Sequence, residues 1–264
     1  MAGSSQVRAE DMRAVLTTVG ECLEQWDDPK AWMHHLLTQS SALAGTDLAS
    51  LILATPHPDP LQMTWRDREV IGLDDDVAKR SFHDVGTRDI PDMPGADIIG
   101  RDILASGAST RRLEELGGLD LFHSTVSYEN VHAATGMCDY VACFRMLPQI
   151  GMMAVATTSK TNTRRAISAR GVAVTRLLWD EMQPLIGTRL ATLDQPSRHG
   201  LSPRLVQTLD ALLDGLSEKH AAARLGISPT TIHQYVGTLY RHFGVESRAE
   251  LMSYFIKRQP VRPQ

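Results

Sequence analysis

Four short helices are predicted from residue 202 onward, because the apolar repeats there are separated by start and stop signals. Each repeat follows a serine, and in two places a proline comes directly after that serine. Serine at the N-cap accepts a hydrogen bond from the first helical turn, proline suits the first helical position, and glycine suits the left-handed residue after a helix. The predicted starts are Ser202, Ser217, Ser228 and Ser247, and the stops before the last helix are Gly215, Gly226 and Gly244.

The third of these helices, residues 229–243, has one apolar stripe and one polar face. Ile232, Val236, Leu239 and Phe243 are spaced at i, i+4, i+7 and i+11, which places them on one side of a helix. The stripe is therefore expected to be buried and the opposite face to be free. In the helix that follows, Leu251, Phe255 and Ile256 are expected to face inward.

Two short helices joined by a tight glycine-containing turn, the second opened by Ser228-Pro229, form a helix-turn-helix. The chain from "LSPR" through "AARLGIS" to "FGVESRAEL" resembles the LuxR-type DNA-binding domain, over residues 201–258. The resemblance implies a four-helix domain whose third helix lies in the major groove and whose fourth commonly makes dimer contacts.

The residues expected to meet DNA lie on the second and third helices of this domain. Gln234 can pair with an adenine edge, threonine hydroxyls can bind phosphate, and the first-turn N–H groups of the third helix can accept a phosphate. Lys219, Arg224, Arg241 and Arg248 are expected to supply fixed positive charge. The predicted DNA-binding residues are Ser217, Lys219, Arg224, Thr230, Thr231, His233, Gln234, Gly237, Thr238 and Arg241.

This reading face departs from the family pattern in its charge. Relatives frequently carry Lys or Arg where this chain has His233, Gln234 and Gly237, and histidine is mostly neutral at neutral pH. Few phosphate contacts and a shallow salt dependence are therefore expected, with DNA binding reliant on dimerisation.

The pattern of the first 190 residues alternates helical and strand-like segments. Helices are predicted around 12–23 and 29–45, a strand over 48–55 and a helical segment over 123–136. Two β-rich runs over 139–147 and 151–158, with a turn between them, precede a long amphipathic helix within 163–193 that is bent at Pro184. The tryptophans Trp26, Trp32, Trp65 and Trp179 are expected in the core or at a dimer surface.

Helices flanking a mainly antiparallel sheet resemble GAF/PAS-like sensor domains, and this layout implies a ligand pocket over the sheet. The fold class predicted for the whole chain is α+β, with an N-terminal GAF/PAS-like domain followed by an all-α four-helix LuxR-type domain. The predicted division is 1–190 for the sensor-like domain, 191–200 for the linker and 201–264 for the helix-turn-helix domain. Pro, Ser, Gly and Asp gather in "ATLDQPSRHGLSP", which is typical of an exposed interdomain segment.

Charge is divided unevenly between the two domains. From Leu201 onward there are eight Lys and Arg against five Asp and Glu, a net charge of +3, and because the chain carries −4 the remainder carries −7. A mildly basic tail on an acidic body is expected when only the tail meets a polyanion.

Several other classes of protein are disfavoured by the sequence. Cys22, Cys138 and Cys143 lack metal-ligand spacing, so reduced structural thiols are expected and neither a metal nor a cofactor. No run of 18 apolar residues and no apolar signal segment occur, which predicts a cytoplasmic protein without a membrane partner. The chain contains 42% apolar residues, enough for proper cores.

Catalysis and phosphorylation control are also disfavoured. The phosphate-loop, GxGxxG, GxSxG and HExxH motifs are absent, and His34-His35, His57 with Asp59, and Asp74-Asp75-Asp76 are typical of solvated surface groups. A phosphorylation receiver requires a lysine after a late strand, and none occurs between Lys79 and Lys160. An acyl-homoserine-lactone receptor stays open, although its pocket residues do not align with this chain.

The function predicted from these patterns is a non-enzymatic transcriptional regulator that binds double-stranded DNA as a homodimer. A small-molecule or protein effector is expected at the N-terminal domain, acting on the readers through the helix at residues 164–190. The alternative is a protein-interaction adaptor that has kept the helix-turn-helix fold without useful DNA affinity.

Overall fold

The computed structural model describes residues 7–56, 63–73, 95–123, 135–161 and 165–258. Its N-terminal part is built on a five-stranded antiparallel sheet with the strand order β2-β1-β5-β4-β3. The strands are β1 (Leu48–Pro56), β2 (Met63–Ile71), β3 (Ala108–Arg112), β4 (Met137–Leu147) and β5 (Met152–Thr161).

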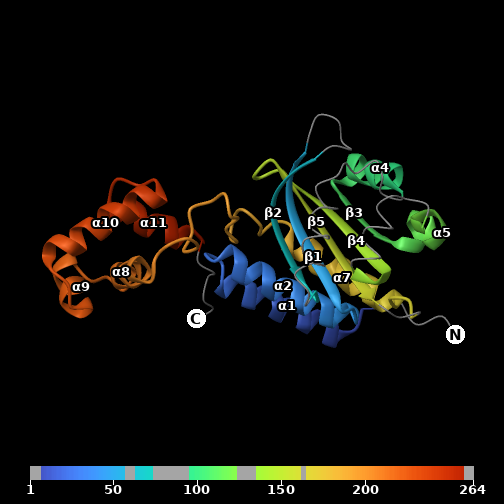
Figure 1. Cartoon of the computed structure of the whole chain (residues 1–264), viewed down its shortest axis with the longest axis horizontal. Coiled ribbons are helices and arrows are strands. Elements are labelled where there is room, and N and C mark those ends of the chain that lie inside the picture. The colour runs from blue at the N-terminus through green and yellow to red at the C-terminus, as the bar shows by residue number, and fades with distance from the viewer. Residues whose placement is uncertain (1–6, 57–62, 74–94, 124–134, 162–164, 259–264) are drawn as a thin grey trace.

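Helices cover both faces of this sheet (Figure 1). One face carries α1 (Ala9–Glu24), α2 (Pro29–Ala44) and α7 (Ala169–Met182). The other carries α4 (Ala96–Ser106), the short 3-10 helix η2 (Leu113–Leu116) and α5 (Gly118–His123). The predicted α+β class is confirmed, because the chain continues from this layered domain into a purely helical one.

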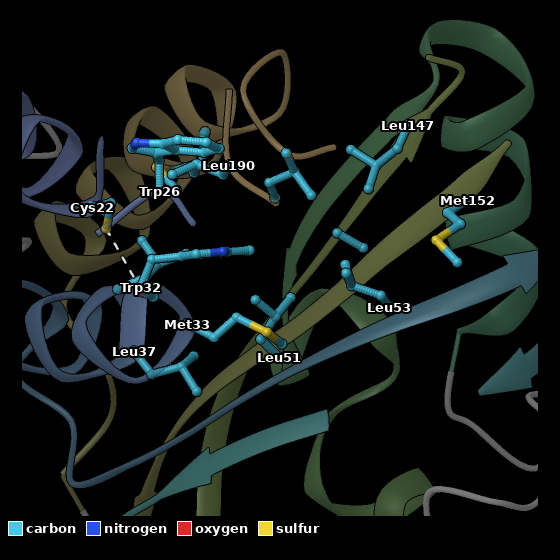
Figure 2. Packing of buried hydrophobic residues seen from close by; sticks show 14 of the residues in the cluster. Cys22, Trp26, Trp32, Met33, Leu37, Leu51, Leu53, Leu147, Met152 and Leu190 are labelled. Atoms are coloured by element: carbon cyan, nitrogen blue, oxygen red, sulfur yellow. Dashed lines mark hydrogen bonds between the residues drawn. The ribbon is translucent and has the colours of Figure 1, made fainter. Parts of the chain in front are cut away.

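Strand β1 is buried on both of its faces. Leu51 and Leu53 pack with Trp32 and Met33 beneath α2, as Figure 2 shows, whereas Leu48 and Ile52 belong to the cluster on the opposite face. A strand covered on both sides needs apolar residues at almost every position, which explains why this segment shows no alternation of apolar and polar residues.

The sequence predictions for α1, α2, β1, β4 and β5 are confirmed. Asp28 caps α2 by accepting hydrogen bonds from two backbone N–H groups, and Gly45 ends the helix with a φ of 68°. Strand β2, strand β3 and helix α4 were not predicted. The predicted helical segment 123–136 lies almost wholly outside the described residues, as do His57, Asp59, Asp74-Asp75-Asp76 and the side chain of Trp65.

The long helix predicted within 163–193 is wrong in its extent. Ser168 caps α7, which ends at Met182, so Pro184 follows the helix rather than bending it. Gln183 to Leu190 form tight turns instead, in which the backbone N–H groups of three successive residues, from Thr188 to Leu190, all donate to the carbonyl of Leu185. Burial of Ile186 and Leu190 holds these turns against the core.

The segment 191–200 was predicted to be exposed, and much of it is instead packed against its surroundings. Ala191, Thr192 and Ser197 are buried. The backbone N–H of Ala191 donates to the Trp26 carbonyl at 2.8 Å, and the Trp32 indole Nε1 donates to the Ala191 carbonyl at 2.8 Å. Asp194, His199 and Gly200 are exposed, whereas Gln195 and Arg198 form hydrogen bonds to Gly187 and Asp27. The domain boundaries themselves stay a prediction.

The C-terminal part contains four helices, and each lies where its start signal predicted it. Ser202, Ser217 and Ser228 each accept a hydrogen bond from the first helical turn, and Gly226 and Gly244 adopt left-handed backbone conformations at the helix ends. The inward orientation predicted for Ile256 is wrong, since this residue is 65% exposed, whereas Leu251 and Phe255 are buried. The helices are α8 (Pro203–Leu213), α9 (Glu218–Leu225), α10 (Pro229–Phe243) and α11 (Arg248–Arg258).

Gly171 lies where α7 packs closely against the end of α2, so its replacement is expected to change the stability of the protein. A Cβ at this position would lie 2.7 Å from the carbonyl oxygen of Ala44, closer than normal van der Waals contact. Gly171→Ala is therefore expected to lower the free energy of unfolding by about 1–3 kcal/mol, measured by urea denaturation.

Gly20 in α1 provides the matched control, because a Cβ there meets nothing within 4 Å. Gly20→Ala is expected to raise the free energy of unfolding by up to about 1 kcal/mol through helix propensity. Equal effects of the two substitutions would contradict the close approach of α7 to α2.

Candidate nucleic-acid interface

Helix α10 is held by its apolar stripe and by a capped N-terminus. Ile232, Val236, Leu239 and Phe243 are all buried, as their spacing predicted. The Ser228 hydroxyl accepts a hydrogen bond from the Thr231 backbone N–H at 3.1 Å. Packing against α8 and α9 fixes the helix in a helix-turn-helix arrangement and leaves its opposite side free.

The predicted DNA-binding residues lie on α9 and α10 and at the N-cap of α9, and all of them reach solvent at least in part. This end of the molecule lies away from the sheet (Figure 1). Three of them, Thr231, Gly237 and Thr238, are partly exposed. The others are exposed: Ser217, Lys219, Arg224, Thr230, His233, Gln234 and Arg241. The N-terminal domain therefore does not seal this surface.

Gly237 leaves an open position in the middle of α10. A Cβ there would meet no atom within 4 Å, so packing does not require glycine at this position. Absence of a side chain allows another molecule to approach the helix backbone closely. The neighbouring Thr238 hydroxyl donates to the backbone carbonyl of Gln234 at 3.0 Å. The side-chain amide of Gln234 forms no hydrogen bond with the described residues.

The positive charge of this surface is partly neutralised within the domain. Arg224 forms an ion pair with Asp214 at 2.6 Å, and His233 Nδ1 lies 3.2 Å from Glu218 Oε2. Arg241 donates instead to the neutral oxygens of Thr238 and Gly237. In the described part of the chain Lys219 makes no ion pair, so Lys219 and Arg241 are the predicted contacts whose charge stays uncompensated.

Arg248, which is expected to supply positive charge from outside the reading face, has its guanidinium bonded to backbone carbonyls. Its guanidinium donates to the carbonyl of Leu216 at 2.7 Å and to that of Leu212 at 2.9 Å, at the C-terminal end of α8. Leu212 lies in the last turn of α8, and Leu216 lies in the loop that follows this helix. The residue therefore fastens α11 to α8, and the spacing of its neighbours in sequence gave no sign of this role.

Sequence reasoning also missed a set of contacts between the two domains. Arg198 donates both to Asp27, in the turn between α1 and α2, and to Asp210 on α8. Desolvation by burial raises the pKa of the Asp27 carboxyl, and the Arg198 guanidinium opposes this shift. The rings of Trp26 and Phe255 meet edge to face with centroids 5.3 Å apart. We call the five residues Trp26, Asp27, Arg198, Asp210 and Phe255 the interdomain clasp.

The linker is also tied to the reading helix. His242, near the end of α10, lies with Nε2 2.7 Å from the Ser197 carbonyl oxygen. The Tyr254 hydroxyl on α11 donates to the Pro196 carbonyl. Because the partners are 45 and 58 residues apart in sequence, no local pattern could have indicated these bonds.

The remaining candidate residues of the N-terminal domain, two histidines and two cysteines, lie in hydrogen-bonded or buried positions. His34 and His35 lie beside Glu69 and Glu21, at 3.2 and 2.8 Å. Burial raises the pKa of the Cys22 thiol to about 12 and that of the Cys143 thiol to about 11. Within the described ranges no group of three metal-ligating side chains is gathered, and no helix there is both long and apolar enough to span a membrane.

Structural comparisons find distant likenesses along the chain. SdiA in complex with octanoyl-rac-glycerol is 14% identical, with 96% of this chain and 97% of that chain covered and a TM-score of 0.41. The N-acylhomoserine-lactone-dependent LuxR family factor CepR2 from Burkholderia cenocepacia is 15% identical, with coverage of 66% and 91% and a TM-score of 0.41. A phycoerythrobilin-bound GAF domain from a cyanobacterial phytochrome is 13% identical, with coverage of 67% and 94% and a TM-score of 0.39.

Sequence comparison gives a more specific result for the C-terminal domain. No curated protein sequence matches the chain. The model of the family described as bacterial regulatory proteins, luxR family, matches residues 199–255, which include all four helix starts and the whole of α10. The predicted resemblance is thereby confirmed: residues 199–255 of this chain are a luxR-family helix-turn-helix domain, joined to an N-terminal domain with an antiparallel sheet.

Proposed function

We propose that the protein is a non-enzymatic, cytoplasmic transcriptional regulator that binds duplex DNA as a homodimer and reads the major groove with α10. The observation that carries the proposal is the open polar face of this helix. Gln234 is exposed in its centre, Gly237 leaves the backbone approachable, and Thr230 has the one first-turn N–H group that no described residue accepts, since Ser228 accepts those of Thr231 and Ile232. Helix N-termini attract phosphate, and a glutamine amide can pair with both edge atoms of adenine.

Different residues of this surface suit contacts to base edges and contacts to phosphate. Gln234 and His233 have side chains that can reach base edges, whereas Lys219 and Arg241 carry the uncompensated charge that suits phosphate. The ion pair of Arg224 with Asp214 must open before Arg224 can bind phosphate. Two to four phosphate contacts per protomer are about what this supply of donors allows, so binding should weaken only moderately as salt increases.

The N-terminal domain is proposed to take a small effector against the sheet face that α4 and α5 cover. This face is lined by apolar side chains including Ile52, Phe144 and Val155, with Tyr140 among them. Burial and the nearby Asp139 carboxylate raise the pKa of the Tyr140 phenol, so the group stays protonated and can donate a hydrogen bond. These side chains are buried, so a largely apolar ligand with a polar head would bind there by displacing α4 and α5.

The route from effector to reader is proposed to run through the interdomain clasp. Helix α7 ends at Met182 and does not reach the reader domain. The chain from Gln183 to Arg198 is hydrogen-bonded to the N-terminal domain at several points. Arg198 then joins this folded segment to α8, and the Trp26–Phe255 contact joins the turn between α1 and α2 to α11. A change in the N-terminal domain that moves the turn between α1 and α2 would displace the reader as one body.

The alternative function, a protein-interaction adaptor, has one observation in its favour. The ion pair of Arg224 with Asp214 and the position of Glu218 beside His233 leave Lys219 and Arg241 as the uncompensated positive charges of the predicted contacts. The DNA experiment below therefore decides between the two functions.

Two substitutions separate base reading from phosphate binding. Gln234→Ala is expected to cost about 1–3 kcal/mol on the preferred operator and to leave nonspecific binding unchanged, because it removes a base contact. Lys219→Ala is expected to weaken binding to all duplexes alike and to reduce the slope of log K against log[salt] by about 1. The measurements are fluorescence anisotropy titrations across salt, on an operator selected from random duplexes.

The control is Arg204→Ala on α8, because Arg204 contacts only Gln207 among the side chains described. Failure of the wild-type protein to bind any duplex at low salt would favour the adaptor. Equal losses from Gln234→Ala on selected and random DNA would contradict base reading by α10.

Loss of the clasp is expected to release the reader without unfolding it. Arg198→Met removes the guanidinium from between Asp27 and Asp210, leaving the buried Asp27 carboxylate without its cation. Hydrogen exchange of the backbone amides in residues 195–200 is expected to become at least about tenfold faster, since docking is weakened by more than about 1.4 kcal/mol.

Asp210→Asn tests the reader side of the same contact and keeps the Asp27 pair. It should accelerate exchange in 195–200 less than Arg198→Met does, while Arg204→Met on the same helix should change nothing. Unaltered protection in Arg198→Met would show that the clasp does not hold the two domains together.

A further inference from the structure

A polar recess of about 350 Å³ opens beside strand β3, at the free edge of the sheet. Helix α4 contributes Asp102 to its wall, β3 contributes Thr110 and Arg111, and α7 contributes Arg176 and Asp180. Arg145 from β4 completes the lining. Three guanidinium groups and two carboxylates therefore surround one hollow, which has an excess of one positive charge.

Arg145 is the most deeply placed of these cations, at 1% exposure. Its Nη1 atom donates to the carbonyls of Ser109 and Phe144, at 2.8 and 2.9 Å. Its Nη2 atom donates to the Thr110 hydroxyl at 2.9 Å and to Asp180 at 2.8 Å. The Nε–H group is buried without a hydrogen-bond partner among the described residues, so one of the five N–H groups of this guanidinium is unsatisfied.

The single carboxylate that faces Arg145 neutralises it incompletely. The side chain of Asp180 is 53% exposed, so its charge is well solvated and weakly felt at the buried guanidinium. Transfer of a cation out of water is costly unless opposite charge is held close to it. An anion bound in the recess would supply that charge.

The other two arginines of the recess differ in how their charge is used. Asp102 accepts hydrogen bonds from Arg111 Nε and Nη2, at 2.8 and 2.9 Å, and these bonds lower the pKa of the Asp102 carboxyl. Arg176 donates to the Thr110 carbonyl at 3.2 Å. No described carboxylate forms an ion pair with Arg176, so its charge is available to a ligand.

We propose that this recess binds a small oxyanion, a carboxylate or phosphate group, between Arg176 and the Arg145–Asp180 pair. Planar guanidinium groups suit both anions because their paired N–H donors match two oxygens. The site is separate from the proposed effector face. Arg145 and Cys143 point to the α7 side of β4, whereas Phe144 and Tyr140 belong to the cluster on the opposite side.

The test is isothermal titration calorimetry of the full chain with inorganic phosphate and with succinate, at constant ionic strength adjusted with sodium chloride. Saturable binding of at least one of the two anions at low millimolar concentration is expected, and the pair of titrations distinguishes phosphate from carboxylate. Arg176→Gln is expected to weaken binding about tenfold or more, because it removes a charge-assisted contact.

Asp180→Asn gives the more discriminating result. It removes the carboxylate that competes for Arg145 and is expected to tighten anion binding severalfold, whereas a purely structural role for the pair predicts no gain. Arg101→Gln is the control, since Arg101 lies on the exposed side of α4 and pairs with Asp97 at 2.9 Å.

Three outcomes would overturn the proposal. They are heats no larger than those of chloride for both anions, an unchanged affinity in Arg176→Gln, and equal losses in Arg176→Gln and Arg101→Gln. Circular dichroism of each variant shows whether the fold is retained, and because Arg176 and Arg101 are both surface residues, loss of fold in either is not expected.

Discussion

The relation between the two domains depends on one cation shared by two carboxylates. Arg198 reaches Asp27 in the N-terminal domain and Asp210 in the reader, and its own backbone N–H donates to the Asp27 carbonyl at 2.9 Å. Burial raises the pKa of the Asp27 carboxyl, and the Arg198 guanidinium beside it stabilises the ionised form. The contact is thus sensitive to small displacements of either domain, in a way that the large apolar cores are not.

The C-terminal domain could be predicted almost completely because its signals are local. Each helix has its own serine cap and three of the runs end at a glycine, so signals within and beside each run were enough to place each element. The exposed face of α10 followed from the four-residue spacing of Ile232 and Val236. The roles of Arg224 and Arg248 did not follow, because their partners Asp214, Leu212 and Leu216 lie at or just after the C-terminal end of α8, outside the helices that carry the two arginines.

The N-terminal domain was less predictable because several of its elements depend on residues far away in the sequence. Its edge strand β3 has only five residues and contains two arginines, a composition typical of a loop, and it becomes a strand because β4 supplies its hydrogen bonds. Strand β2 likewise contains four charged residues, yet it pairs with β1 along nearly its whole length. Pairing between distant segments therefore determined both elements, and helix α7 stopped early because burial of Ile186 and Leu190 favoured turns over another helical turn.

The bond between His242 and Ser197 makes α10 a lever whose pivot lies at the linker. The helix has 15 residues and is therefore about 22 Å long. A tilt of about 10° at the His242 end would carry the Ser228 end through about 4 Å, comparable with the rise of about 3.4 Å between neighbouring base pairs. If the proposed dimer forms and the reader domain tilts with α10 as one body, such a tilt would change the separation of the two readers by about one base step, so the linker contact would set which DNA spacing is accepted.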